Sequence, residues 1–340
     1  MNQSQVTEYV ASASKPNTNT NIIEARNLVK QYDAPNGTTA VNGISFDIPR
    51  GQIFSLLGPN GAGKSTTISM LSCLMPPTSG DAMVAGYSVT KDSKAVREHI
   101  GVVPQEIALY ENLTAAENLH FWGQMYGLSG PALRTRVDEI LDLIGLKDKA
   151  RQRVSTYSGG MKRRVNIGVG LLHRPDIVFM DEPTVGVDPQ SRRNILDNIK
   201  QLNKDGMSVL YTTHYMEEAQ EISDEIAIVD HGQIIAKGTQ QELINKVGEK
   251  TIIEIVIDEG SLQGRLIDSP AINAMRDLDG ISHVKVDGNK IQSLCLDAGA
   301  MLAPLLGTAS RHHLVVKNVA VNEPNLEMVF LHLTGRALRD

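Results

Sequence analysis

The chain has 340 residues, of which 41% are hydrophobic and 21% charged, so its composition is that of an ordinary globular protein with room for about two domains. The formal net charge is −6 and no run of Lys and Arg could follow a nucleic-acid backbone, which argues against nucleic acid as the main partner. No apolar run approaches the roughly 18 residues that span a bilayer, and two cysteines are too few for a disulfide framework or a thiolate metal site.

The first segment in chain order, residues 1–21, is rich in Ser, Asn, Thr and Gln, which predicts a disordered tail. It lacks the basic start and apolar centre of a secretory signal. Residues 22–247 then alternate strand-like and helix-like segments, the pattern of an α/β domain. Four short apolar strands are predicted in it: Gln52–Leu57, Val178–Met180, Ser208–Thr212 and Glu225–Val229.

Between the first two of these strands, residues 109–172 predict a subdomain that is almost entirely helical. Thr114 and Glu117 have the spacing of a capping box, in which each side chain satisfies a free backbone N–H of the other residue. The basic residues Lys162–Arg164 are expected to lie at a solvated helix start. A stripe at helical spacing is expected to face the core: Leu119, Trp122, Met125 and Tyr126.

Residues 248–340 differ in character and predict a small α+β accessory domain. Asp287-Gly288-Asn289 is a strong hairpin signal between two strand-like segments. The order β-α-β-β-α-β predicts a ferredoxin-like module. The elements expected are strands at 251–257, 281–286, 290–296 and 314–321 and helices at 271–278, 298–306 and from Asn325 to a cap at Gly335.

The most specific motif is a glycine-rich loop between a predicted strand and a predicted helix, Gly58-Pro59-Asn60-Gly61-Ala62-Gly63-Lys64-Ser65. It fits G-x-x-x-x-G-K-[ST] at every fixed position. Glycines let several backbone N–H groups point at one phosphate chain, and the following helix adds its positive end. Lys64 is expected to reach the β- and γ-phosphates of ATP, and the Ser65 hydroxyl to bind Mg²⁺.

A second motif places two carboxylates directly after four apolar residues: Asp181 and Glu182 follow Ile177–Met180. A buried strand would deliver both to its end, where Asp181 can join the Mg²⁺ shell and Glu182 can polarise an attacking water. They lie 181 − 64 = 117 residues after Lys64. The two motifs must therefore meet through the fold.

Further motifs resemble those of ATP-binding cassette (ABC) proteins. Residues 157–161, Tyr-Ser-Gly-Gly-Met, resemble the Leu-Ser-Gly-Gly-Gln signature of that family, although Tyr and Met replace its Leu and Gln. Gln105 resembles the glutamine of the Q-loop, and Val187-Asp188 resembles the D-loop. His214 resembles the switch histidine, and Tyr32 the aromatic residue that stacks on adenine. These motifs occur in the family's order over residues 26–240.

The resemblance implies a P-loop NTPase fold, with a RecA-like core and a helical subdomain, that hydrolyses ATP with Mg²⁺. Two copies of the chain would close head to tail, so that Ser158, Gly159 and Gly160 contact the γ-phosphate in the opposite subunit. The implied catalytic residues are Glu182, His214, Gln105 and Lys64, and the implied metal ligands are Ser65, Gln105 and Asp181. The implied nucleotide-binding residues are Tyr32, Gly58, Pro59, Asn60, Gly61, Ala62, Gly63, Lys64, Ser65, Thr66, Ser158, Gly159, Gly160 and Asp188.

Within the family, residues 157–161, residues 170–175 and the segment from Pro324 to Gly335 are similar to drug-resistance and nodulation-type export ATPases. That resemblance implies a subunit on the cytoplasmic face of the cell membrane, paired with an ABC-2-type permease. An importer ATPase is a closer alternative than a soluble ABC ATPase acting on nucleic acid or ribosomes. A GTPase would need N-K-x-D, which residues 203–206 approach without the final Asp. The transported substrate is not readable from this chain.

Overall fold

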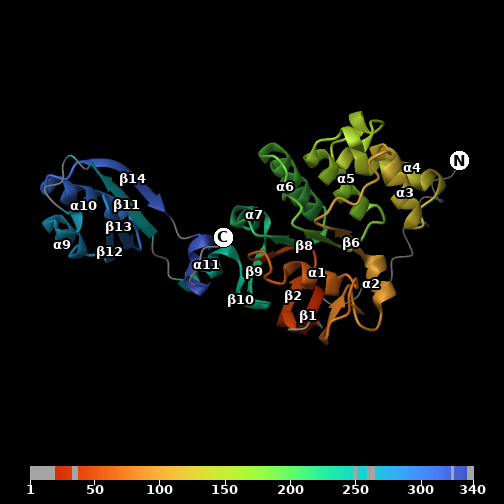
Figure 1. The fold of residues 1–340 in the computed structure, drawn as a ribbon, viewed down its shortest axis with the longest axis horizontal. Coiled ribbons are helices and arrows are strands. Elements are labelled where there is room, and N and C mark those ends of the chain that lie inside the picture. The colour runs from red at the N-terminus through yellow and green to blue at the C-terminus, as the bar shows by residue number, and fades with distance from the viewer. Residues whose placement is uncertain are drawn as a thin grey trace. The chain divides into compact units, whose positions relative to one another are not determined.

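A computed structural model describes residues 20–32, 37–247, 251–258, 260, 265–322 and 325–334 (Figure 1). Most of the predicted tail at residues 1–21 lies outside the described residues, as do Pro324 and Gly335. The chain divides into two compact units, the first ending at Thr239 and the second beginning at Gln240. No helix in the described residues combines the length and the apolar character that a membrane crossing needs.

The first unit is built on a six-stranded sheet. Five of its strands run parallel, and β10 pairs antiparallel at one edge. The strand order is β10 (Gln233–Gly238), β9 (Glu225–Asp230), β3 (Ile53–Leu57), β8 (Ser208–Thr213), β7 (Ile177–Asp181) and β6 (Ile100–Val103). The strands β3, β7 and β8 are buried at every residue, as expected for parallel strands covered on both faces. The four predicted strands are therefore confirmed.

An antiparallel sheet and two helices pack on the first face of the six-stranded sheet. The side chains that bring the two sheets together include Phe46 and Phe54, whose rings stack with centroids 5.2 Å apart, and Phe179 lies in the same core. The elements are β2 (Thr38–Pro49), β1 (Asn21–Tyr32), β4 (Ser79–Val84) and β5 (Tyr87–Ser88) in that order, with helices α1 (Lys64–Leu71) and α2 (Ser93–His99).

The opposite face carries helices. Val178, Met180 and Tyr211 point into this second core, while their neighbours Ile177, Phe179 and Leu210 point into the first, as strand alternation requires. The elements are α3 (Ala115–Met125), α4 (Gly130–Leu143), the 3₁₀ turns Lys147–Lys149 and Val154–Thr156, α5 (Gly159–Leu171), α6 (Pro189–Lys204) and α7 (Met216–Ile222). The predicted helical character of residues 109–172 is confirmed.

The capping box at the start of α3 is confirmed. The Glu117 N–H donates to Thr114 Oγ1 (3.2 Å), and the Thr114 N–H donates to Glu117 Oε2 (2.8 Å). The predicted core stripe is wrong at Met125 and Tyr126, which are 68% and 41% exposed. The buried line of the helix passes through Leu119 and Gly123 instead, because Leu133 packs where a Gly123 side chain would stand.

The expectation of a solvated helix start at Lys162–Arg164 is also wrong for its central residue. The helix α5 begins at Gly159, and Arg163 is buried at 4% exposure. Its guanidinium donates to the backbone carbonyls of Pro104 (2.8 Å) and Gln105 (2.5 Å). The charge is therefore held by a loop that lies 58 residues earlier in the chain.

The second unit contains the predicted β-α-β-β-α-β order. All its strand pairs are antiparallel, and the strand order is that of a ferredoxin-like module, so the prediction is confirmed. In the same unit α8 packs against α11, although α8 lies before our sequence-based boundary at 247/248. The elements are α8 (Gln240–Val247), β11 (Thr251–Ile257), the 3₁₀ turn Leu266–Asp268, α9 (Pro270–Arg276), β12 (Ile281–Asp287), β13 (Lys290–Cys295), α10 (Ala298–Arg311), β14 (Val316–Asn322) and α11 (Leu326–Thr334).

Candidate nucleotide-binding site

Four neighbouring parallel strands deliver the predicted site residues to one edge of the sheet. In the order β3, β8, β7 and β6, their carboxyl ends lead into the glycine-rich loop, His214, the acidic pair Asp181–Glu182, and Gln105. In open parallel sheets this edge is where ligands bind. Residues as far apart as Lys64 and His214 therefore become neighbours.

The glycine-rich loop has a backbone path that only glycine allows. Gly61 and Gly63 have φ of +80° and +102°, a region that residues with a side chain rarely adopt. A side chain at Gly58 would lie 2.2 Å from the Val229 carbonyl oxygen, and one at Gly63 would lie 2.4 Å from that of Ala40. With side chains excluded, the loop can turn its N–H groups toward a phosphate chain, so it fits the predicted ligand.

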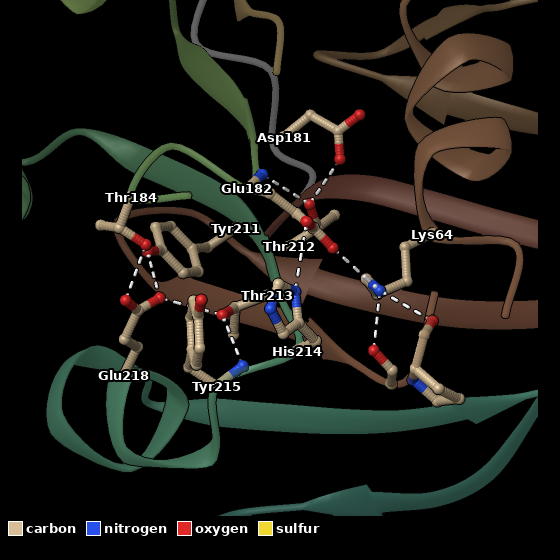
Figure 2. A network of polar contacts seen from close by, with 12 residues as sticks. Lys64, Asp181, Glu182, Thr184, Tyr211, Thr212, Thr213, His214, Tyr215 and Glu218 are labelled. Carbon is tan, nitrogen blue, oxygen red and sulfur yellow. Dashed lines mark hydrogen bonds and ion pairs between the residues drawn. The ribbon is translucent and has the colours of Figure 1, made fainter. Parts of the chain in front are cut away.

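Lys64 opens helix α1 and is buried at 4% exposure. Its Nζ donates to the carbonyls of Gly58 (2.7 Å) and Pro59 (3.0 Å) at the start of its own loop. It also forms an ion pair with Glu182 Oε1 at 3.1 Å (Figure 2). Ser65 is exposed and Thr66 is half-buried in the first turn of the helix.

The acidic pair is fixed by Thr212 of the adjacent strand β8. The Thr212 hydroxyl donates to Asp181 Oδ1 (2.6 Å) and accepts from the Glu182 N–H (3.0 Å). Glu182 has φ of +45°, an unfavourable region for a residue with a side chain, and only 5% of it is exposed. Strain of this kind persists only where the surroundings enforce it, and it concentrates at functional sites.

The Glu182 carboxylate lies between two basic side chains (Figure 2). Its Oε1 faces Lys64, while its Oε2 lies 3.2 Å from His214 Nδ1, within ion-pair distance but outside hydrogen-bond geometry. The His214 ring packs at a tilt against Tyr215, with centroids 4.1 Å apart. A carboxylate held in this way beside a phosphate-binding loop can orient and deprotonate a water.

Gln105 follows strand β6 and is exposed. Its backbone carbonyl is the group that Arg163 binds, and in the described part of the chain no hydrogen bond joins its side chain to Asp181 or Glu182.

Sequence reasoning missed Arg163, because a run of three basic residues is typical of a solvated surface. Burial lowers the pKa of Arg163, while nearby Tyr211 and Asp181 oppose that shift.

The signature and D-loop residues begin two adjacent helices. Ser158 caps α5 by accepting from the Met161 N–H (3.3 Å), and Asp188 caps α6 by accepting from the Ser191 N–H (2.9 Å). A side chain at Gly160 would lie 2.0 Å from Ser191 Oγ, so glycine is required where the two helix starts touch. Among the described residues, no hydrogen bond or ion pair connects this pair of caps to the glycine-rich loop of the same chain.

The two departures from the signature pattern have different surroundings. Tyr157 is buried and its hydroxyl donates to the Lys149 carbonyl (2.7 Å), so it anchors the turn before α5. Met161 is partly buried against the helical core.

Tyr32 ends strand β1 at 39% exposure, with its hydroxyl 3.5 Å from Met75 Sδ. The Lys30 Nζ lies over the Tyr32 ring, 5.7 Å from its centroid, and stacking of this ring on adenine stays a prediction.

Comparisons with known proteins are consistent with this geometry. Residues 41–185 match the family model described as ABC transporter. The chain is 46% identical over 324 residues to the linearmycin resistance ATP-binding protein LnrL of Bacillus subtilis, which covers 94% of this chain and 100% of that protein. It is 39% identical over 321 residues to the daunorubicin/doxorubicin resistance ATP-binding protein DrrA of Streptomyces peucetius, covering 94% of each. Among solved structures, the dimeric post-hydrolysis cassette MJ0796 bound to ADP and Pi has a TM-score of 0.59 and 28% identity, over 64% of this chain and 98% of that one.

Proposed function

This chain belongs to the ABC transporter family of ATP-binding proteins, and from that premise we propose that it powers an exporter through the site at the ends of β3, β8, β7 and β6. It is an ATPase subunit with the P-loop fold of the family. The observation that carries the proposed chemistry is the position of Glu182, a buried carboxylate held between Lys64 and His214 beside the glycine-rich loop.

In the proposed roles, Glu182 is the general base that deprotonates the attacking water, and His214 keeps the base and the γ-phosphate in place. Lys64 leaves its carbonyl partners to bind the β- and γ-phosphates. The Ser65 hydroxyl, the Asp181 carboxylate and the Gln105 amide are oxygen donors of the kind that Mg²⁺ prefers, and we assign them to that ion. Bound Mg²⁺ would neutralise phosphate charge. Thr212 holds Asp181 in position from the neighbouring strand.

We assign Ser158, Gly159, Gly160 and Asp188 to the nucleotide bound by a second copy of the chain. Ser158 and Asp188 cap neighbouring helices, whose N-termini attract phosphate. A relative of 28% identity has been solved as a dimer with ADP and Pi, which supports this arrangement. Each site would then be complete only when two copies close on ATP.

We propose that the membrane partner is an ABC-2-type permease and that the chain lies against it on the cytoplasmic face of the membrane. The support is the full-length similarity to LnrL and DrrA, whose names describe resistance to linearmycin and to daunorubicin and doxorubicin. We propose a drug-like, lipid-like or polysaccharide-like compound as the exported substrate, and the names of those relatives favour a drug-like one. The test is purification of the tagged chain from detergent extracts of its own cells, where a polytopic membrane protein should be recovered with it.

The catalytic assignment is tested with Glu182→Gln. The amide preserves size but cannot act as a base, so hydrolysis should slow by about a hundredfold or more while ATP binding is retained. Glu221→Gln is the matched control, because Glu221 is a carboxylate ion-paired with Arg193 and Lys200 on the surface of the same unit. Turnover near wild type in Glu182→Gln would show that another group is the base.

A further inference from the structure

A second buried carboxylate, Glu218, lies next to the proposed site, and its partners Thr184, Tyr211, Thr213 and Arg192 are not among the residues assigned to the nucleotide. It stands in the first turn of α7 and is 2% exposed. Three hydroxyl groups donate to it: Thr184 Oγ1 to Oε1 at 2.6 Å, and Tyr211 Oη and Thr213 Oγ1 to Oε2, each at 2.9 Å (Figure 2).

Two of these partners lie within two residues of the proposed catalytic pair in the sequence. Thr184 lies two residues after Glu182, and Thr213 immediately precedes His214. The Thr213 hydroxyl also accepts from the Tyr215 N–H (2.9 Å), so it holds the chain on both sides of His214. One carboxylate therefore fastens the segment that follows the base and the segment that carries the histidine.

A third element reaches the same carboxylate. Arg192 of α6 lies with Nε 3.4 Å from Glu218 Oε1, and its guanidinium stacks over the Tyr215 ring at 4.4 Å. Arg192 is four residues after Asp188, the cap of α6. The Glu218 carboxylate thus also connects Thr213, the residue before His214, to helix α6, which begins after Asp188.

The burial of the charged Glu218 carboxylate indicates a functional role for it. Moving a carboxylate out of water costs several kcal/mol, and hydrogen bonds inside the protein offset this cost only in part. A well-packed apolar residue at position 218 would often be at least as stable, so the carboxylate is not explained by stability alone. Burial, followed by the charge of Glu218, raises the pKa of Tyr211 well above its ordinary value. The Tyr211 hydroxyl therefore stays protonated and remains a donor to Glu218.

We propose that Glu218 is a positioning residue for ATP hydrolysis, which holds Glu182 and His214 in register through Thr184 and Thr213. The inference rests on the proposed roles of those two residues. Without the carboxylate, the turn after Glu182 and the end of β8 would lose their common acceptor. The 3.2 Å approach of His214 Nδ1 to Glu182 Oε2 would then no longer be enforced.

The experiment compares Glu218→Ala with Asp81→Ala in the full-length chain. Asp81 is the matched control because it also accepts three hydrogen bonds, from the Ser88 hydroxyl and two backbone N–H groups, but in the antiparallel sheet. In Glu218→Ala we expect kcat to fall about tenfold to a hundredfold with KM for ATP changed less than about twofold, because misplacement of a reacting group lowers rate more than binding. Asp81→Ala should lower Tm at unchanged kcat.

Glu218→Gln and Thr184→Val keep the test valid if the alanine variant does not fold. The amide oxygen of Gln can still accept from Tyr211 and Thr213, and its N–H can donate to Thr184, so kcat should recover most of the loss. Thr184→Val removes one donor at constant shape and should lower kcat without changing KM. Wild-type kcat in Glu218→Ala, or in Thr184→Val where the alanine variant does not fold, overturns the inference.

Glu182→Gln, measured alongside, separates the two levels of failure. If Glu182→Gln is slow and Glu218→Ala turns over normally, only the positioning role is wrong. If Glu182→Gln turns over normally, the assignment of the base is wrong, whatever Glu218→Ala does.

Discussion

Replacing Arg163 with Met should uncouple the signature helix α5 from the loop that carries Gln105. Arg163 is five residues after Ser158, and its two hydrogen bonds to the carbonyls of Pro104 and Gln105 connect these segments directly. Met has a similar length and no donor. The change therefore removes the connection while keeping most of the buried volume.

The expected loss of stability follows from two opposing contributions. Each hydrogen bond from a charged donor contributes about 1.5–3 kcal/mol, so the pair amounts to about 3–6 kcal/mol. Removing the buried guanidinium also removes its desolvation cost of several kcal/mol. We expect a net loss of about 2 kcal/mol, which lowers Tm by about 4–8 °C for a unit of this size. The displaced loop should lower kcat by about tenfold.

The assay is thermal unfolding together with ATP hydrolysis measured over a range of Mg²⁺ concentrations. Arg164→Met is the matched control, because Arg164 on the same helix donates to the carbonyls of Ile144 (2.9 Å) and Gly145 (3.3 Å) at the end of α4. Both variants should lose stability, but only Arg163→Met should lose turnover and need more Mg²⁺. Equal kcat values in the two variants would refute the reasoning.

Three further predictions concern single features of the same unit. Lys64→Ala should weaken ATP binding about tenfold or more in calorimetry, because a buried charge-assisted contact is lost; unchanged affinity would contradict the role of the loop. Gly160→Ala should abolish hydrolysis through the clash with Ser191, and adding Ser191→Gly should restore part of it. Burial lowers the pKa of His173, so the unfolded chain binds that proton more readily and stability should fall as the pH drops below the ordinary value of about 6.5. In His173→Gln the dependence of Tm on pH between about 7 and 5 should flatten; an unchanged slope would exclude His173 as its source.

The parallel strands were predictable because a strand that is buried on both faces has a short, unbroken apolar sequence, such as residues 177–180. The antiparallel strands β1 and β2 were not singled out, although each has 12 residues. Their pairing shifts register at several points, and Asn27, with φ of +49°, interrupts the alternation in β1 between Ala25 and Leu28. An irregular strand loses the period of two by which sequence patterns are recognised.

The residues of the candidate site likewise fall into those that the sequence predicted and those that it did not. The glycine-rich loop and the acidic pair were identifiable because backbone geometry and strand burial limit which residues can stand there. Arg163 and Glu218 were not, because their surroundings are decided by distant partners such as the Pro104 carbonyl and the Thr184 hydroxyl. For Glu218 there was little indication of burial in the sequence, because it is one of several glutamates in a helix rich in polar residues, four residues after His214. The roles of Ser158–Gly160 stay predictions, since they concern a second copy of the chain.

The strand order also has a consequence for the time course of synthesis. β3 pairs with β8 and β9, and β7 pairs with β6 and β8, so no hydrogen bond joins β3 to β7 directly. Lys64 and His214 are separated by 214 − 64 = 150 residues, which takes about 8–30 s to translate at roughly 5–20 residues per second. Until β8 emerges and inserts, the phosphate loop and the acidic pair belong to separate fragments of sheet, and the nascent chain cannot hydrolyse ATP. The strand that leads into His214 is also the one that joins β3 to β7 in the sheet.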